Sequence, residues 1–148
     1  MPARSTFYDL VAAEWRNRGV LLMPPASEIE VARVFADLGC PLSADVRSLY
    51  AVAGGFADYE FDRLWSFWSL GRIRKENVPG RRPFVMFADW LLHSHVYCFH
   101  YENPEVSSIY ISHDRRSLDR DPIAGSLAEF LETLLCSPDE VEAWPLDS

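Results

Sequence analysis

The residue types best suited to chemistry lie together between residues 93 and 100. His93, His95, Cys98 and His100 all fall within this short stretch. Imidazole and thiolate groups are preferred zinc ligands, and a cysteine beside a histidine can form a thiol nucleophile with its general base. The stretch is rich in aromatic and β-branched residues, so we predict that a strand positions these side chains.

The expected strand geometry argues against both kinds of site. Because side chains alternate along a strand, Cys98 and His100 are expected on the face opposite the other two histidines. Zinc usually takes at least three protein ligands, which could not converge from two faces without a sharp bend. Nothing around Cys98 supplies an orienting group or an oxyanion loop. We therefore predict no metal ligand, no catalytic residue and no cofactor; a small enzyme that uses this strand is the least favoured alternative.

The sequence carries no other recognisable catalytic or ligand-binding motif. Neither GxGxxG nor GxxxxGK[ST], the two glycine-rich signatures of phosphate loops, occurs in it. Asp58, Glu60 and Asp62 alternate like calcium ligands but lack the glycine and the distal glutamate of a calcium loop. We interpret them as part of a solvated loop. The basic residues of 72–75 and 81–82 are interpreted as a patch that faces solvent or pairs with local acids.

Cysteine usage and hydropathy indicate the compartment. Cys40, Cys98 and Cys136 are odd in number, far apart and set among apolar residues, which is typical of buried free thiols in a reducing compartment. No run of about 18 apolar residues could span a membrane, and the N-terminus lacks the apolar core of a secretory signal. We therefore predict a cytoplasmic protein with no membrane contact.

The net charge of -8 is unevenly distributed along the chain. Residues 1–100 hold 11 basic and 11 acidic side chains, whereas residues 101–148 hold 3 basic and 11 acidic ones. The acidic third argues against nucleic-acid binding, because phosphate contacts need clustered lysine and arginine. It favours a basic protein partner through long-range steering, or else serves solubility alone. The candidate partner-binding residues are Glu102, Glu105, Asp114, Asp119, Asp121, Asp139, Glu140, Glu142 and Trp144.

Helical periodicity predicts three helices before residue 54. Ser5 or Thr6 is expected to cap the first helix, which should end before Gly19. Ser27 and Glu30 form a capping box for the second, because each side chain can satisfy the other's backbone amide. The expected buried stripes are Phe7, Leu10, Val11 and Trp15, then Val31, Val34, Phe35 and Leu38, then Val46, Leu49, Tyr50 and Ala53.

Strands are expected after residue 60, where the apolar period changes from about 3.6 to about 2. Gly54 and Gly55 should end the third helix, since glycine readily takes the left-handed conformation of a helix terminus. The turn at 102–105 is interpreted as a hairpin connection. The expected strands are 61–70, 83–90, 95–101 and 107–112.

A final helix is predicted from Ser126, which forms a second capping box with Glu129. Its stripe comprises Leu127, Phe130, Leu131, Leu134 and Leu135. The chain is therefore expected to form a single α+β domain over residues 1–148, in which N-terminal helices and a C-terminal helix pack on an antiparallel sheet. Residues 139–148 are expected to form an acidic tail.

Four segments follow one another in a characteristic order. A helix-like segment at 42–50 runs into Gly54-Gly55-Phe56, and Phe67-Trp68-Ser69-Leu70 follows. The stretch FADWLLHSHVY occupies 87–97, and IAGSLAEFL occupies 123–131. In this order and spacing, over residues 27–136, they resemble the SUKH superfamily. That superfamily includes the Smi/Knr yeast cell-wall regulators and many bacterial toxin-immunity proteins.

The resemblance implies an α+β fold that works through protein–protein contact, with no catalysis and no cofactor. It implies an immunity protein that neutralises a polymorphic toxin, such as a nuclease or a deaminase. We separately expect a monomer or weak homodimer. A regulatory module of the same fold without a toxin partner is the alternative. The resemblance carries no partner-binding residues across, because that surface varies among members. Recurrent residues that we interpret as turn and core positions are Gly54, Gly55, Trp68, Ala88, Asp89 and Tyr97.

Overall fold

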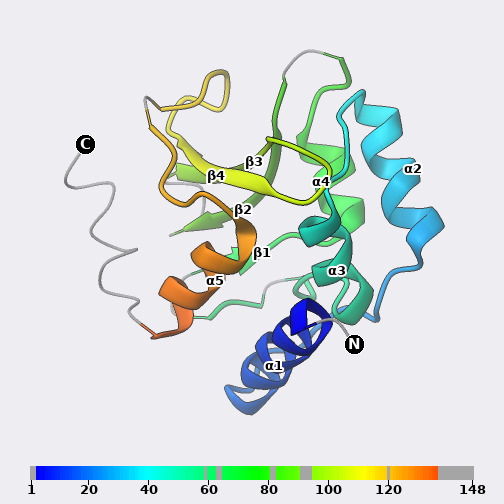
Figure 1. Cartoon of the computed structure of the whole chain (residues 1–148), viewed down its shortest axis with the longest axis vertical. Coiled ribbons are helices and arrows are strands. Elements are labelled where there is room, and N and C mark those ends of the chain that lie inside the picture. Colours follow the sequence, from blue (N-terminus) through cyan, green and yellow to red (C-terminus); the bar gives the residue numbers. More distant parts are fainter. Residues whose placement is uncertain are drawn as a thin grey trace.

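Five helices and one four-stranded antiparallel sheet make up the described part of this computed structural model (Figure 1). The structure describes residues 3–58, 60–62, 65–80, 83–90, 95–119 and 121–136. The elements are α1 (Ala3–Asn17), α2 (Glu28–Leu38), α3 (Ala44–Val52), β1 (Trp65–Phe67), α4 (Leu70–Glu76), β2 (Val85–Trp90), β3 (His95–Tyr101), β4 (Ser107–Ser112) and α5 (Leu127–Cys136). The strands pair in the order β1-β2-β3-β4. The predicted α+β class is confirmed.

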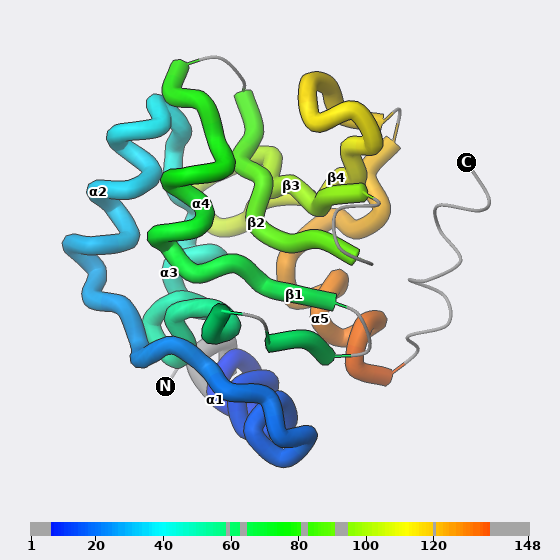
Figure 2. Tube along the Cα trace, turned by 180° about the vertical axis from the view of Figure 1, so that it is seen from behind, coloured from blue at the N-terminus to red at the C-terminus, as the bar shows by residue number. Residues whose placement is uncertain are grey.

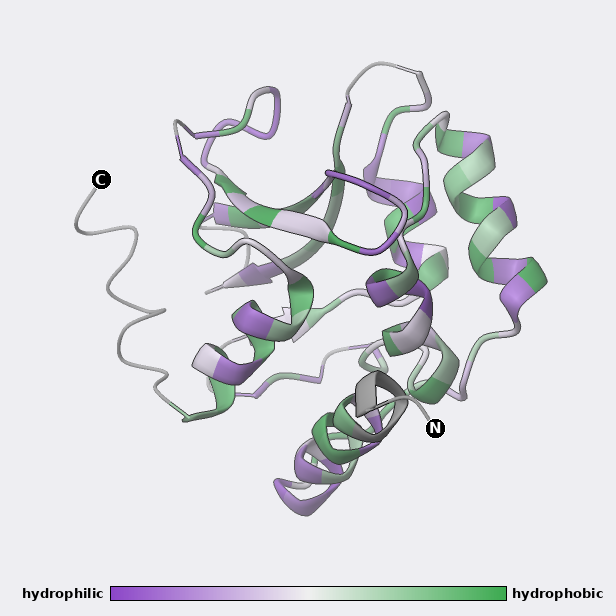
Figure 3. Ribbon diagram, viewed as in Figure 1, coloured by the Kyte–Doolittle hydropathy of each residue, from purple (hydrophilic) through white to green (hydrophobic). Residues whose placement is uncertain are grey.

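The aromatic face of the sheet forms the main core. Phe87 of β2 stacks on Phe99 of β3 with ring centroids 3.8 Å apart. Phe130 of α5 lies 5.4 Å from the ring of Tyr97, and Trp15 of α1 lies 4.9 Å from the ring of Phe67. Helices from both ends of the chain therefore bury the same face. Figure 3 shows polar and apolar residues mixed along α2 and α5, as expected of helices with one buried side.

The second helix forms as its sequence predicts, whereas the first differs in two respects. Ser27 and Glu30 make the expected capping box, and α2 ends at Gly39 with φ 74°. The first helix already begins at Ala3, so neither Ser5 nor Thr6 caps it. Its buried residues are Tyr8, Val11, Ala12 and Trp15, whereas Leu10 is 65% exposed. The buried stripe is rotated because α1 packs mainly against α3 rather than on the sheet alone.

The two glycines after α3 serve close packing rather than helix termination. The C-cap is Ala53 in an extended conformation, so the expected left-handed glycine cap is wrong. A Cβ at Gly54 would overlap the Pro24 carbonyl oxygen. Gly55 has φ 97°, and a Cβ there would lie 2.5 Å from the Trp68 carbonyl oxygen. Both positions bring three backbone segments together beside the sheet.

We expect Gly55→Ala to lower the free energy of unfolding by about 1–3 kcal/mol, because the new methyl group meets backbone that cannot rotate away. Gly71→Ala is the matched control. Gly71 lies inside α4 with an open Cβ position, so alanine there should be neutral or slightly stabilising. Urea unfolding midpoints of the two variants test this. Equal stability of both would contradict the close approach at Gly55.

The first predicted strand is much shorter than expected, and an unpredicted helix follows it (Figure 2). Among the described residues of 61–70, the named strand is Trp65–Phe67, and Leu70–Glu76 forms α4. Ser69 caps this helix by accepting a hydrogen bond from the Arg72 amide. The helix has two turns and a single buried residue, Ile73, too few to produce a periodic signal. The remaining strands match the predictions to within two residues at each end.

The hairpin and the last helix largely follow the sequence. Asn103 accepts hydrogen bonds from the amides of Glu105 and Val106, which closes the predicted turn between β3 and β4. Ser126 caps α5 through the Glu129 amide. The Glu129 carboxylate accepts from Gly125 rather than from Ser126, so the second capping box is only half formed.

Loops cover part of both edges of the sheet. Phe56 donates its amide to the Phe67 carbonyl beside β1. Beside β4, the Ile109 amide donates to Ala124, and the Asp119 amide donates to Ile111. These bonds occupy backbone groups that a partner strand would otherwise pair with, so a binding mode by strand addition is disfavoured at these positions.

Candidate functional site

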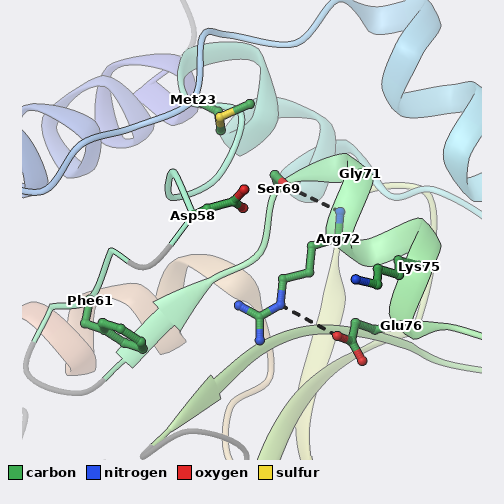
Figure 4. A pocket seen from close by; sticks show the side chains of 8 residues that line it. All are labelled: Met23, Asp58, Phe61, Ser69, Gly71, Arg72, Lys75 and Glu76. Atoms are coloured by element: carbon green, nitrogen blue, oxygen red, sulfur yellow. Dashed lines mark hydrogen bonds and ion pairs between the residues drawn. The ribbon is translucent and has the colours of Figure 1, made fainter.

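A cleft of about 510 Å³ opens between α4 and the side chains of Met23, Asp58 and Phe61 (Figure 4). One wall is α4, and Figure 4 shows Met23, Asp58 and Phe61 on the other side of the opening. The volume lies within the range of about 300–1,000 Å³ that is typical of binding sites. The lining residues are Met23, Asp58, Phe61, Ser69, Gly71, Arg72, Lys75 and Glu76.

The apolar side of the cleft depends on an antiparallel pairing between two loops. Met23 donates its amide to the Gly55 carbonyl, and Ala57 donates to Leu21. In an extended segment residues two apart share a side, so Leu21 and Met23 point the same way. Both are exposed, and Met23 and Phe61, which line the cleft, are 41% and 39% exposed. Exposed apolar side chains thus gather at this opening.

The charged side of the cleft is fixed by a buried carboxylate. Asp89 of β2 is 1% exposed and accepts a hydrogen bond from Trp68 Nε1 at 3.3 Å. Its other oxygen lies 3.3 Å from Arg72 Nη2. The guanidinium of Arg72 also lies 4.7 Å from the Trp68 ring centroid, a cation–π distance. Arg72 is therefore held in one orientation at the cleft.

A second arginine reaches the same cluster from the loop after β4. Arg115 Nη2 lies 2.8 Å from Glu76 Oε1, and the opposite carboxylate oxygen of Glu76 lies 3.9 Å from Arg72 Nε. Arg115 has φ 63°, a left-handed conformation that costs a non-glycine residue about 1–2 kcal/mol. The turn is held by Asp114, whose carboxylate accepts from the amides of Arg116 and Ser117. These hydrogen bonds lower the pKa of Asp114 to about 2.

The described lining of the cleft contains no histidine or cysteine. Its one hydroxyl group, that of Ser69, accepts a hydrogen bond from the Arg72 amide. Lys75 is the only lysine of the chain. Within the described residues, neither Lys75 nor Asp58 forms an ion pair, and no three histidine, cysteine or acidic side chains gather as metal ligands.

The structure separates the predicted partner-binding acids into two groups. Glu102 and Glu105 lie in the hairpin before β4, whereas Asp114, Asp119 and Asp121 follow β4. Glu102 bonds Ser108 near the start of β4, and the Asp119 amide bonds Ile111 near its end, so the two groups lie towards different ends of the strand rather than in one patch. Four further candidates lie outside the described residues: Asp139, Glu140, Glu142 and Trp144.

Two of these acids are hydrogen-bonded to neighbouring histidines. Glu102 accepts from Ser108 Oγ at 2.6 Å and contacts His100 Nδ1 at 2.8 Å, and these hydrogen bonds lower the pKa of Glu102. Asp119 contacts His113 Nδ1 at 2.8 Å. Their charges can still act at a distance, but these carboxylates already have partners within the domain.

The histidine and cysteine strand is mostly internal. Cys98 is fully buried, so a substrate cannot reach its thiol. His95 is 2% exposed and its Nε2 lies 2.7 Å from the Tyr97 hydroxyl. His100 is half-exposed on the other face, bonded to Glu102. His93 lies outside the described residues.

Burial gives His95 an expected pH dependence. Burial, reinforced by His113 and opposed by Asp119, lowers the pKa of His95 to about 4. Since the unfolded state then binds a proton at higher pH than the folded state, stability should fall as the pH drops from about 6.5 to about 4. The loss due to this group is about 3 kcal/mol. Urea unfolding of wild type and His95→Gln at pH 8 and pH 4.5 tests this; identical losses in both proteins would rule out His95 as the cause.

The family follows from a comparison with protein-family models. The model described as the SMI1 / KNR4 family (SUKH-1) matches residues 25–133. The chain belongs to this family. The match includes both walls of the cleft except Met23, whereas α1, which contributes Trp15 to the core, precedes it. No match was found among curated proteins. None of the helices in the described ranges is both long and apolar enough to cross a membrane.

The sequence reading missed the cleft and the cluster beneath it. The basic residues of 72–75 lie on α4. The expected pairing with a local acid holds for Arg72, whose Nε lies 3.9 Å from Glu76 Oε2, whereas Arg74 bonds Asp37, 37 positions away in the sequence. Asp89 is expected only as a turn or core position, and nothing in the sequence predicts its contact with Arg72. The only available signal was that burial of an acid demands a cationic or hydrogen-bonding partner.

Proposed function

We propose that this chain is a non-catalytic protein-binding domain that acts as an immunity protein in the cytoplasm. In this proposal it binds and neutralises a basic toxin domain of the nuclease or deaminase class. Membership of the SMI1/KNR4 family carries the proposal, because the matched residues include nearly the whole sheet and its helices. A monomer or weak homodimer over residues 1–148 is part of the same proposal.

Charge and site chemistry support binding to a basic partner. The excess negative charge lies in residues 101–148, where acidic side chains flank both ends of β4. Such a field attracts a cationic protein and accelerates encounter. The cleft, in turn, offers contact residues without a catalytic pair.

The direct test uses the protein encoded by the gene immediately upstream, which this proposal expects to carry a basic toxin domain. Co-expression should restore growth to cells producing that domain, and the two purified proteins should form a complex. Binding without protection would favour the regulatory alternative. Absence of both binding and protection would overturn the proposal.

We expect charge reversal in the acidic groups to slow association. Glu105→Lys combined with Asp121→Lys should cut the association rate about tenfold at low salt, with a smaller effect at high salt, because exposed charges are screened. Stability should change by less than about 0.5 kcal/mol, since both residues are exposed. Stopped-flow binding at two ionic strengths measures this.

Asp9→Lys is the matched control, an exposed acid on α1 far from the acidic third in sequence. Like the two reversals, it makes the net charge of the chain more positive, but the change lies on α1. If it slows association as much per charge as the two reversals do, net charge alone steers the partner. A rate that depends on neither salt nor these variants would leave the acidity as a solubility feature.

A further inference from the structure

We propose that the cleft between α4 and Phe61 is the contact site for a loop of the protein partner. The loop would place an apolar side chain between Met23 and Phe61 and a carboxylate against Lys75. This inference rests on the proposed function and names the surface that performs it. The acidic residues around β4 would act on the rate of encounter, and the cleft on the lifetime of the complex.

The residue types at the cleft are those of interface centres. Aromatic residues, methionine and arginine are enriched where proteins meet. Met23, Phe61 and Arg72 all line this opening, and Figure 4 places the first two across from α4. The described residues include six exposed large apolar side chains, of which two line the cleft and Leu21 lies beside Met23. No other described cleft combines exposed side chains of this kind with unpaired charge.

The polar wall is rigid before any partner arrives. Arg72 is held by Asp89, Trp68 and Glu76, and Arg115 supports Glu76 from a strained backbone conformation. A side chain that is already ordered loses little entropy on binding, so its contacts contribute more fully to affinity. The cluster therefore holds the polar side of the cleft in place before binding.

The charges of the cleft select the chemistry of the occupant. Lys75 presents an ammonium group without an ion-pair partner among the described residues, in a chain whose net charge is -8. Asp58 lies across the opening and would repel a second carboxylate. A loop with one acidic side chain could pair with Lys75 on α4, while a neighbouring apolar side chain of the loop contacts Met23 and Phe61. A protein with a positive net charge can supply such a loop, because it can still carry individual acidic residues on its surface.

The first experiment compares dissociation rates of variants from the toxin domain used above. Phe61→Ser and Lys75→Glu should each raise the dissociation rate about tenfold or more, as substitutions at the centre of an interface do. Ile29→Ser and Arg33→Glu on α2 are matched controls, since each removes or reverses an exposed side chain of the same kind. The controls should stay within about twofold of wild type. Unfolding midpoints confirm that all four variants fold.

The single lysine permits a second, independent measurement. Acetylation by an amine-reactive reagent, followed by peptide mass spectrometry, reports the accessibility of Lys75 directly. Complex formation should slow acetylation of Lys75 at least about fivefold, as expected when a side chain becomes buried at a protein interface. If acetylation of Lys75 slows as the concentration of this chain rises in the absence of partner, a second copy of the chain fills the cleft. That result would overturn the proposal.

The outcomes separate this inference from the proposed function. A complex that forms, protects cells and is weakened only by the cleft variants supports both. A complex whose dissociation is unchanged by Phe61→Ser and Lys75→Glu, with Lys75 still reactive, keeps the function and overturns the cleft. If wild type neither binds nor protects, the proposed function is wrong and the cleft inference falls with it.

Discussion

Asp45→Ala is expected to lower the free energy of unfolding by about 3–5 kcal/mol. The Asp45 carboxylate is buried and accepts four hydrogen bonds. One oxygen accepts from Ser43 Oγ at 2.6 Å and from the Val46 amide at 2.8 Å. The other accepts from the amides of Ser107 and Leu127, each at 3.2 Å. A single side chain therefore joins α3, β4 and the start of α5.

The size of the expected loss follows from what alanine would leave behind. The amides of Ser107 and Leu127 would remain buried without an acceptor, at a cost of about 1–3 kcal/mol each. Two helix starts would also lose a negative charge that favours them. Asp45→Asn keeps the volume but replaces one acceptor oxygen with a donor group, so its stability should lie between those of wild type and Asp45→Ala.

Asp37→Ala provides the comparison in urea or thermal unfolding. Asp37 is exposed and pairs with Arg74, an interaction worth less than about 1 kcal/mol. If Asp45→Ala were no more destabilising than Asp37→Ala, the four hydrogen bonds would contribute little. Circular dichroism should show that the Asp45 variants keep their helices at low temperature, so that the difference reports stability rather than misfolding.

Leu131→Ala should destabilise the domain by about 2–5 kcal/mol. Leu131 is fully buried on α5, next to Phe130, whose ring lies 6.1 Å from that of Phe87 in the sheet. Removing three carbons from this fully buried core side chain leaves a cavity beneath α5. The surroundings can collapse only in part, so the cavity cost adds to the lost burial.

The matched comparison for Leu131 is Leu10→Ala on α1, which removes the same atoms from a side chain that is 65% exposed. Its expected effect is below about 0.5 kcal/mol. Equal losses in the two variants would show that α5 is not anchored through this face. Since the Leu127 amide of α5 also donates a hydrogen bond to Asp45, the double variant of Asp45 and Leu131 should lose more stability than either single variant.

In our proposals the acidic groups increase the rate of association, and the cleft lowers the rate of dissociation. The two acidic groups lie at opposite ends of β4, which suits long-range attraction from several directions better than one contact patch. The cleft carries exposed apolar side chains beside an ordered arginine, which suits a lasting contact. Measuring association and dissociation rates separately therefore tests the two surfaces independently.

The sequence by itself determined those features whose interactions are local. The Ser27 capping box, the stripe of α2, the Asn103 turn and the Ser126 cap all join residues no more than four positions apart. The change of apolar period was enough to predict the order of helices and strands, and hence the α+β class. The resemblance to a family held for the same reason, because its landmarks are local segments in a fixed order.

Only the tertiary structure decided the site. Arg72 meets Asp89 across 17 positions, Arg115 meets Glu76 across 39, and Asp45 meets Leu127 across 82. Such contacts depend on strand register and on where each loop returns, and neither leaves a periodic trace in the sequence. The same holds for the acids, which look clustered along the chain but are set apart by the length of β4. An acid expected to be buried must have a cationic or hydrogen-bonding partner. Which residue is that partner depends on the tertiary structure.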